Sequence, residues 1–175
     1  MIRLGRGKWK GHILRPSLQG CRPTSGLVRG AVFDIAGEIT ASASTVWDLC
    51  CGTGAVGIEA LSIGASSAVF VDRQRAPREL IASFLDEREA LDAARIITGD
   101  VRRIVPLKGE SPDLVFIDPP YSELYLYNWI WSLDWGSIVA PGGLVFVESG
   151  GDPGLAGWTT RGYGDSWLSW MKGPR

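Results

Sequence analysis

The sequence has little histidine and little cysteine. His12 is the only histidine, and the three cysteines are Cys21, Cys50 and Cys51. An odd count with two adjacent residues argues against a disulfide framework, and no Cys/His spacing is typical of a zinc site. We therefore expect no metal, and a location in the cytoplasm.

Long hydrophobic runs are also missing, because no apolar stretch approaches the about 20 residues that span a bilayer. The start, MIRLGRGKWKG, carries charge but no apolar segment of a signal peptide, so we expect neither secretion nor a membrane partner. Repeats and low-complexity linkers are absent. With 175 residues, 45% of them hydrophobic and 21% charged, the chain is expected to be globular.

Acidic residues are missing from the first 30 positions. The whole chain holds 18 basic and 19 acidic residues, which gives a net charge of −1. The N-terminal segment is nevertheless basic, and the rest of the chain is acidic. Such asymmetry suggests that one end meets a polyanion, although a solvated segment that binds nothing would look the same. We expect residues 1–22 to form a basic arm with a small β-hairpin, and residues 23–175 the main domain. The basic residues of the N-terminal segment are Arg3, Arg6, Lys8, Lys10, Arg15, Arg22 and Arg29.

Beyond the arm, apolar strands alternate with helices. This alternation predicts an α/β fold, a doubly wound, mostly parallel, seven-stranded sheet of Rossmann-like type. We expect helices over 22–37, 55–64, 76–92 and 122–138, with Thr24 or Ser25 as a possible N-cap of the first. We expect strands over 45–49, 67–72, 95–100, 113–120 and 143–149, and two short strands around Gly162 and Gly164.

An acidic residue falls at the end of each of four successive strands. These residues are Asp48, Asp72, Asp100 and Asp118. Ligands of doubly wound sheets bind at the carboxyl ends of the strands. The four carboxylates therefore mark the expected ligand site.

A glycine-rich loop joins the first of these strands to its helix. It contains Gly52, Thr53 and Gly54 in a G-x-G-x-x-G pattern that closes at Gly57, and Asp72 lies 20 residues after Gly52. Glycines let the backbone approach a ligand, and an acid at this distance suits ribose hydroxyls. The pattern is typical of a dinucleotide site, so NAD is a candidate, as is a tight structural turn without a ligand.

The rest of the chain favours S-adenosylmethionine over NAD. Asp48 precedes the loop, where a negative side chain would repel a pyrophosphate but suit a cationic ligand. A dehydrogenase needs a proton relay, yet His12 lies in the basic arm and no Tyr-x-x-x-Lys occurs. The length also leaves no room for a second, substrate-binding domain.

The fourth strand ends in Asp118-Pro119-Pro120-Tyr121. An exocyclic amine is a poor nucleophile until two acceptors orient its N–H bonds, and the Asp118 carboxylate and the Pro119 carbonyl could supply both. Pro120 would stiffen the turn, and Tyr121 could stack on a base. Charge that develops on the amine would be stabilised by Asp118. The alternative is a turn that only ends a strand.

Four segments together resemble the RsmD family of class I S-adenosylmethionine-dependent methyltransferases. They are GKWKGHIL, RPTSGLVRGAVFDI, DLCCGTGAVGIEALSIGA and DLVFIDPPY. Members of this family are bacterial enzymes that methylate the N2 of one guanine in 16S ribosomal RNA. The resemblance covers about residues 3–149. DPPY is shared with adenine-N6 enzymes, so RPT…VR is the more specific segment.

The resemblance implies a role for each matched position. Cofactor contacts would come from Asp48, Gly52, Thr53 and Gly54, from Asp72 and Arg73, and from Asp100 and Val101. The target guanine would lie against Asp118, Pro119, Pro120 and Tyr121. RNA backbone contacts would come from Lys8, Lys10, Arg15, Arg22 and Arg29.

The chain departs from the family pattern at Gly30, usually an acid, and at Asp34, usually Asn. These departures concern RNA contacts rather than methyl transfer. The substrate is expected to be 16S ribosomal RNA in a small-subunit particle, and the enzyme a monomer. The alternatives are methylation of adenine N6 in DNA or of a protein glutamine, an NAD-binding protein, and a binding protein without catalysis.

Overall fold

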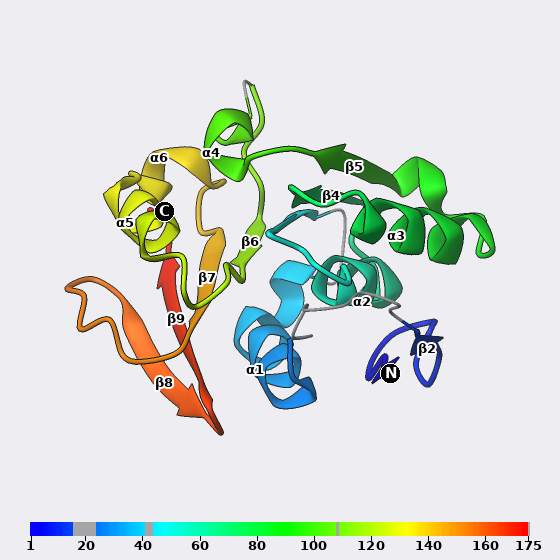
Figure 1. Ribbon diagram of the computed structural model, residues 1–175, viewed down its shortest axis with the longest axis horizontal. Helices are drawn as coiled ribbons and strands as arrows, with labels where there is room; N and C mark the ends of the chain where they lie inside the picture. Colours follow the sequence, from blue (N-terminus) through cyan, green and yellow to red (C-terminus); the bar gives the residue numbers. More distant parts are fainter. Residues whose placement is uncertain (16–23, 41–43, 108, 175) are drawn as a thin grey trace.

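The computed structural model describes residues 1–15, 24–40, 44–107 and 109–174. A seven-stranded sheet organises the molecule, in the spatial order β5-β4-β3-β6-β7-β9-β8 (Figure 1). The strands, in that order, are Ala94–Thr98, Ser67–Asp72, Thr45–Leu49, Leu114–Ile117, Leu144–Ser149, Ser166–Lys172 and Thr159–Tyr163. The strands β5, β4, β3, β6 and β7 are parallel to one another, whereas β9 runs antiparallel to both β7 and β8. The predicted fold class is confirmed.

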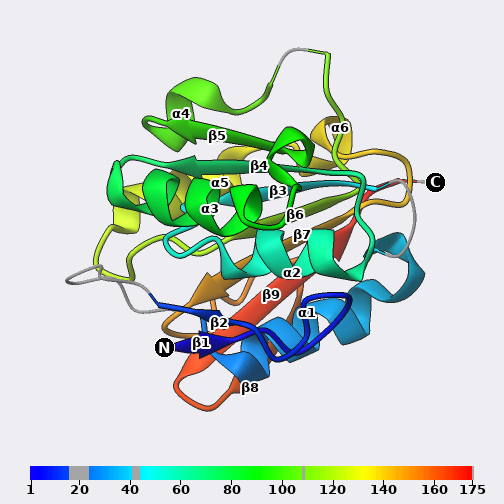
Figure 2. The same ribbon diagram turned by 90° about the vertical axis from the view of Figure 1, so that its right-hand side faces the viewer.

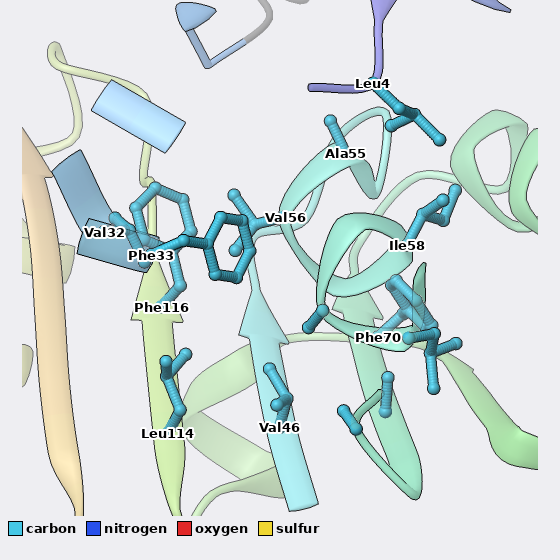
Figure 3. Close-up of a cluster of buried hydrophobic side chains, with 14 of the residues drawn as sticks. Leu4, Val32, Phe33, Val46, Ala55, Val56, Ile58, Phe70, Leu114 and Phe116 are labelled. Carbon is cyan, nitrogen blue, oxygen red and sulfur yellow. The ribbon is translucent and has the colours of Figure 1, made fainter. Parts of the chain in front are cut away.

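Helices cover both faces of the sheet (Figures 1 and 2). One face packs on α1 (Gly26–Ala36), α2 (Ala55–Ile63) and α3 (Ala76–Asp86), and the other on α4 (Val101–Ile104), α5 (Leu124–Ser132) and α6 (Trp135–Ile138). Two 3-10 turns, η1 (Gly37–Thr40) and η2 (Leu91–Ala93), complete the helical elements of the described residues. Because side chains alternate along a strand, each central strand contributes to both cores. On the first face, Val32 and Phe33 of α1 lie near Phe116 of β6 and Val56 of α2 (Figure 3).

The expected N-terminal hairpin is present, with β1 (Ile2–Arg3) antiparallel to β2 (Ile13–Leu14). Its apolar residues enter the core of the main domain, where Trp9 meets Phe84 edge-on at 5.8 Å between ring centroids. Two hydrogen bonds of 2.8 Å, from the backbone N–H groups of Lys8 and Trp9, join it to Ser62. The hairpin is therefore packed along α2, and a domain boundary at residue 22 stays a prediction.

Two predicted helices differ from the observed ones. The helix expected over 76–92 ends at Asp86, because Glu89 adopts a positive φ of 52° and turns the chain towards β5. The helix expected over 122–138 breaks into α5 and α6, because the indole Nε1–H of buried Trp135 donates to the carbonyl of Ile130. Neither turn contains the glycine or proline that would have indicated it. Helix α4 was not predicted, and Asp100 caps it.

A buried ion pair links the hairpin to both nearby helices. Arg29 of α1 is 6% exposed, and its Nε donates to the Glu59 carboxylate of α2 at 3.0 Å. The other guanidinium nitrogens donate to the carbonyls of Thr24, at 2.7 Å, and Arg3, at 2.9 Å. Glu59 also accepts the backbone N–H of Gly5. Arg29 was expected to contact RNA; that expectation is wrong, because its guanidinium is enclosed in the protein.

Across the described ranges, no helix combines the length and the apolar character that a bilayer span requires.

Replacing Arg29 by alanine should strongly destabilise the protein. Breaking a buried pair leaves Glu59 as an uncompensated buried charge, which costs about 3–5 kcal/mol of unfolding free energy. The matched control is Arg6→Ala, which removes a pair with Asp34 whose side chains are 38% and 70% exposed. That control should cost less than about 1 kcal/mol in urea unfolding. Equal losses for the two variants would contradict the structural role of Arg29.

Candidate active site

A cavity of about 430 Å³ opens at the carboxyl ends of the central strands. It lies where the strand order reverses on either side of β3, the position at which doubly wound sheets bind ligands. The residues that line it come from segments far apart in the sequence. They include Thr24, Gly52, Thr53, Asp72, Arg73, Asp100, Val101, Asp118, Pro119, Pro120, Tyr121 and Glu148.

The glycine loop turns the chain from β3 into α2. Gly52 and Gly54 have positive φ angles of 49° and 67°, which favour glycine. A Cβ on Gly54 would lie 2.6 Å from the Ile81 side chain, so the loop needs glycine there for packing as well. Gly52 and Thr53 line the cavity as expected, whereas Gly54 lies outside the lining and is the N-cap residue of α2.

Asp48 does not face the cavity. Its side chain is 1% exposed and accepts the backbone N–H of Gly57 at 2.8 Å, beneath the loop. Burial raises its pKa to about 8, although the hydrogen bond from Gly57 acts to lower the pKa. The carboxyl is therefore largely neutral at neutral pH. The expectations that Asp48 contacts the cofactor and repels a pyrophosphate are therefore corrected: Asp48 holds the loop.

Asp72 and Asp100 do lie on the cavity wall, at the ends of β4 and β5. Asp72 accepts the backbone N–H groups of Gly52 and Gln74, each at 2.9 Å, so it also fixes the glycine loop. Asp100 pairs with the Arg102 guanidinium at 2.6 Å, which with the Arg102 backbone N–H lowers the pKa of Asp100 to about 2. Both acids are placed to accept hydrogen bonds from a ligand.

Arg73 takes part in a polar network at the rim of the cavity. It pairs with Glu123, which also accepts the Tyr125 hydroxyl at 2.6 Å. The Arg102 guanidinium lies over the Tyr125 ring, 4.8 Å from its centroid. This network joins the loops that follow β4, β5 and β6.

Asp118 and Pro119 are held in place by neighbouring hydroxyl groups. The Thr24 hydroxyl donates to the Asp118 carboxylate at 3.2 Å. The buried Tyr127 hydroxyl lies 3.2 Å from the Pro119 carbonyl and 3.1 Å from the Glu148 carbonyl. A carbonyl has two lone pairs, so Pro119 can accept a further donor. The two acceptors expected for an amine therefore line one cavity and have fixed positions.

The Tyr121 ring also has a fixed orientation. Its hydroxyl lies 3.0 Å from both the Glu148 carboxylate and the Ser166 hydroxyl. A Cβ on Gly150 would lie 3.0 Å from the ring, so glycine gives the ring its space. Burial raises the pKa of Tyr121 to about 12, and the phenol stays protonated.

Two cysteines, Cys50 and Cys51, line the cavity without being suited to nucleophilic catalysis. Burial is the main cause that raises the pKa of both thiols, and the charge of the Asp72 carboxylate adds to it. A neutral thiol is a weak nucleophile. Both cysteines therefore serve as small residues of the loop.

The charge of the cavity favours a cationic ligand. Among the described lining residues there are four acids, Asp72, Asp100, Asp118 and Glu148, and one base, Arg73. Such a wall disfavours a pyrophosphate and suits an ammonium or a sulfonium group. The preference for S-adenosylmethionine over NAD thus rests on these acids rather than on Asp48.

The basic residues of the hairpin lie away from the cavity. Lys8, Lys10 and Arg15 are exposed, and Lys8 lies over the Trp9 ring at 4.6 Å. Arg22 lies outside the described residues. The Lys8 backbone contacts Ser62 in the last turn of α2, whereas the cavity adjoins the start of the helix at Ala55, about 10 Å away along the helix axis. An RNA bound to both would have to extend along α2.

Sequence reasoning missed three residues that shape the site: Thr24, Tyr127 and Glu148. Thr24 lies in the RPTSG segment but was considered only as a possible helix cap, a role that Ser25 fills. Glu148 lies near the end of the fifth strand, so the pattern of strand-end acids could have identified it. Tyr127 carried no local signal, because its role depends on how α5 packs.

Comparisons with known proteins agree with the fold. The model of the family described as "Conserved hypothetical protein 95" matches residues 2–161. The chain is 32% identical to "Ribosomal RNA small subunit methyltransferase D" of Escherichia coli K12, over 88% of this chain and 77% of that protein. It is 28% identical to "Putative rRNA methyltransferase YlbH" of Bacillus subtilis, over 84% and 82%. The solved structure "Putative methyltransferase yhhF from Escherichia coli" superposes with a TM-score of 0.79 at 27% identity, over 99% of each chain.

Replacing Asp48 by asparagine should change how stability depends on pH. Between the ordinary pKa of 3.8 and the folded value of about 8, the unfolded chain is ionised while the folded chain keeps the proton. Folding then takes up a proton, so this group costs stability progressively as the pH rises, at up to about 1.4 kcal/mol per pH unit. The asparagine amide would keep an acceptor for Gly57 without that cost.

The measurement is urea unfolding of both proteins between about pH 5 and pH 8. The variant should gain stability relative to the native protein as the pH rises. A difference that does not change with pH would contradict the buried, neutral Asp48.

Proposed function

The chain belongs to the "Conserved hypothetical protein 95" family, and from this premise and the geometry of the cavity we propose that it methylates ribosomal RNA with S-adenosylmethionine. The specific reaction we propose is methylation of the exocyclic N2 amine of a guanine in 16S ribosomal RNA. The observation that carries the proposal is the pair of fixed acceptors, Asp118 and the Pro119 carbonyl, beside the glycine loop in one cavity. The names of the relatives support methyl transfer to ribosomal RNA.

The residues present fit S-adenosylmethionine. The Gly52 and Thr53 backbone would approach its methionine end, Asp72 its ribose and Asp100 with Val101 its adenine. The excess of acidic groups on the cavity wall matches its positive charge. When bound, this cofactor supplies an electrophilic methyl group on a sulfonium. The chain's own residues then have to present and orient the amine.

Asp118 and Pro119 would perform that orientation. Each accepts one N–H bond of the amine, which turns the nitrogen lone pair away from both acceptors and towards the methyl donor. As the C–N bond would form, the C–S bond of the sulfonium would break and leave a neutral thioether. Positive charge would develop on the nitrogen, and the Asp118 carboxylate would stabilise it until one N–H proton passes to water or to that carboxylate. Thr24 keeps the carboxylate in position, and Tyr127 keeps the carbonyl in position. Tyr121 offers a ring, fixed through its hydroxyl, against which the base can stack.

The basic hairpin would supply affinity for the RNA without reading its sequence. Lys8, Lys10 and Arg15 are exposed and suited to phosphate contacts, and Arg22 stays a candidate. We propose that the protein acts in the cytoplasm as a monomer, on a small-subunit particle. A guanine in a duplex would first have to leave its stack.

Two assays test this function. Calorimetry should detect binding of S-adenosylmethionine, and a protein that binds NAD alone would contradict the proposal. Labelled methyl groups should pass to unmethylated 16S RNA or small-subunit particles. Transfer to DNA or to a protein glutamine instead would identify a different amino-methyltransferase.

Asp118→Ala should lower kcat by about 10²–10³, as removal of one preorganised polar group does elsewhere. Binding of S-adenosylmethionine should change little, because the carboxylate acts on the amine. The matched control is Asp92→Ala, an exposed acid in η2, which should keep full activity. Full activity in Asp118→Ala would remove this carboxylate from the mechanism.

Neutralising Lys8, Lys10 and Arg15 together, each to glutamine, should weaken RNA binding and its salt dependence. Each lost phosphate contact reduces the slope of log Kobs against log salt by about 0.7–0.9. The control exchanges charge for charge, with Lys8→Arg, Lys10→Arg and Arg15→Lys, and should keep the slope. Filter-binding at several salt concentrations measures both. An unchanged slope in the glutamine variant would exclude the hairpin from the interface.

A further inference from the structure

A second carboxylate lies beside Asp118. Strands β6 and β7 are parallel with Ile117 opposite Val147, so the residues that follow, Asp118 and Glu148, are neighbours across the two strands. Because side chains alternate, both point to the face of the sheet that carries Phe116 and Phe146. Adjacent strands lie about 4.8 Å apart. Asp118 and Glu148 therefore present two acceptors side by side, and both line the cavity.

Glu148 is only partly satisfied by the protein. Its side chain is 3% exposed, and Oε1 accepts the Tyr121 hydroxyl at 3.0 Å. Among the described residues Oε2 is buried and has no hydrogen-bond partner. A buried carboxylate oxygen without a donor is costly, so a donor supplied by a ligand would complete the site. The backbone of Glu148 is itself fixed, because its carbonyl accepts from Tyr127.

Two adjacent acceptors require a base edge with two adjacent donors. Guanine has this edge, because the N1–H lies next to the N2 amine. Adenine has an amine next to a ring nitrogen that only accepts. This nitrogen and the Glu148 carboxylate would be two acceptors facing each other, which repel. A buried site made to accept an N–H strongly rejects a substrate that lacks it.

We infer that Glu148 is a specificity-determining residue that accepts the N1–H of the target guanine while Asp118 and Pro119 hold the N2 amine. This rests on the proposed function, since it concerns the base that enters the same cavity. A small rotation of the Glu148 side chain when the base enters would direct Oε2 to the N1–H of the guanine ring. The Tyr121 hydroxyl donates to Oε1 and leaves Oε2 for the base.

The test uses 2-aminopurine, which keeps the 2-amine but has no N1–H. Small-subunit RNA is prepared by ligation with guanine or 2-aminopurine at the methylated position, and assembled into particles. For each protein, kcat/KM is measured on both substrates. The native protein should prefer guanine, and Glu148→Met, which has only a weakly accepting sulfur, should lower the guanine to 2-aminopurine ratio by at least about tenfold. Glu148→Gln should lower it less, because the amide keeps one acceptor oxygen.

Tyr121→Phe is the matched control. It removes the hydroxyl from Oε1 but leaves the carboxylate, so its activity can fall while the ratio stays within about twofold of the native value. Cofactor binding and thermal unfolding establish that each variant is folded, and if Glu148→Met does not fold, the ratio in Glu148→Gln decides. Lack of guanine methylation by the native protein would contradict the proposed function. Guanine methylation with an unchanged ratio in the Glu148 variants would overturn this inference alone.

Discussion

The buried ion pair between Arg29 and Glu59 connects the parts of the structure on which the site depends. Glu59 lies on α2, the helix that begins at the glycine loop, and it also binds the hairpin backbone at Gly5. The Arg29 guanidinium donates to the carbonyl of Arg3 in the hairpin and to the carbonyl of Thr24. The Thr24 hydroxyl in turn donates to the Asp118 carboxylate. A continuous set of polar contacts thus runs from the N-terminal hairpin to the acceptor of the amine. The RPTSGLVR segment contributes both Thr24 and Arg29 to this connection.

The parallel sheet provides the second constraint. Its strands end at one edge, so acids at or near the ends of different strands line one cavity. Asp72 and Asp100 lie on the side proposed for the cofactor, and Asp118 and Glu148 lie on the side proposed for the base. Asp48 shows the limit of this reasoning. It lies one residue before the end of β3, points under the loop and accepts from Gly57 instead. Asp48 therefore supports the backbone of the loop, whereas Asp72, Asp100, Asp118 and Glu148 line the cavity.

Much of the fold was predictable because the chain alternates apolar strands with helices, and 45–49 and 67–72 match β3 and β4 residue for residue. The site residues at strand ends were predictable for the same reason. Arg29 was not, because a basic residue in a basic segment looks like a phosphate ligand until the helix face that it occupies is known. The ends of α3 and α5 also carried no local signal, because they depend on the positive φ of Glu89 and on the packing of Trp135. Glu148 needed the register of β6 with β7, which a single sequence does not contain.

The central claim is that the cavity presents the N2 amine of a guanine to a methyl donor. The most direct measurement is to let the protein label unmethylated small-subunit particles, digest the RNA to nucleosides and identify the labelled product by chromatography and mass spectrometry. The account predicts N2-methylguanosine as the labelled nucleoside. Label in N6-methyladenosine, or in a guanosine methylated on a ring nitrogen, would contradict it.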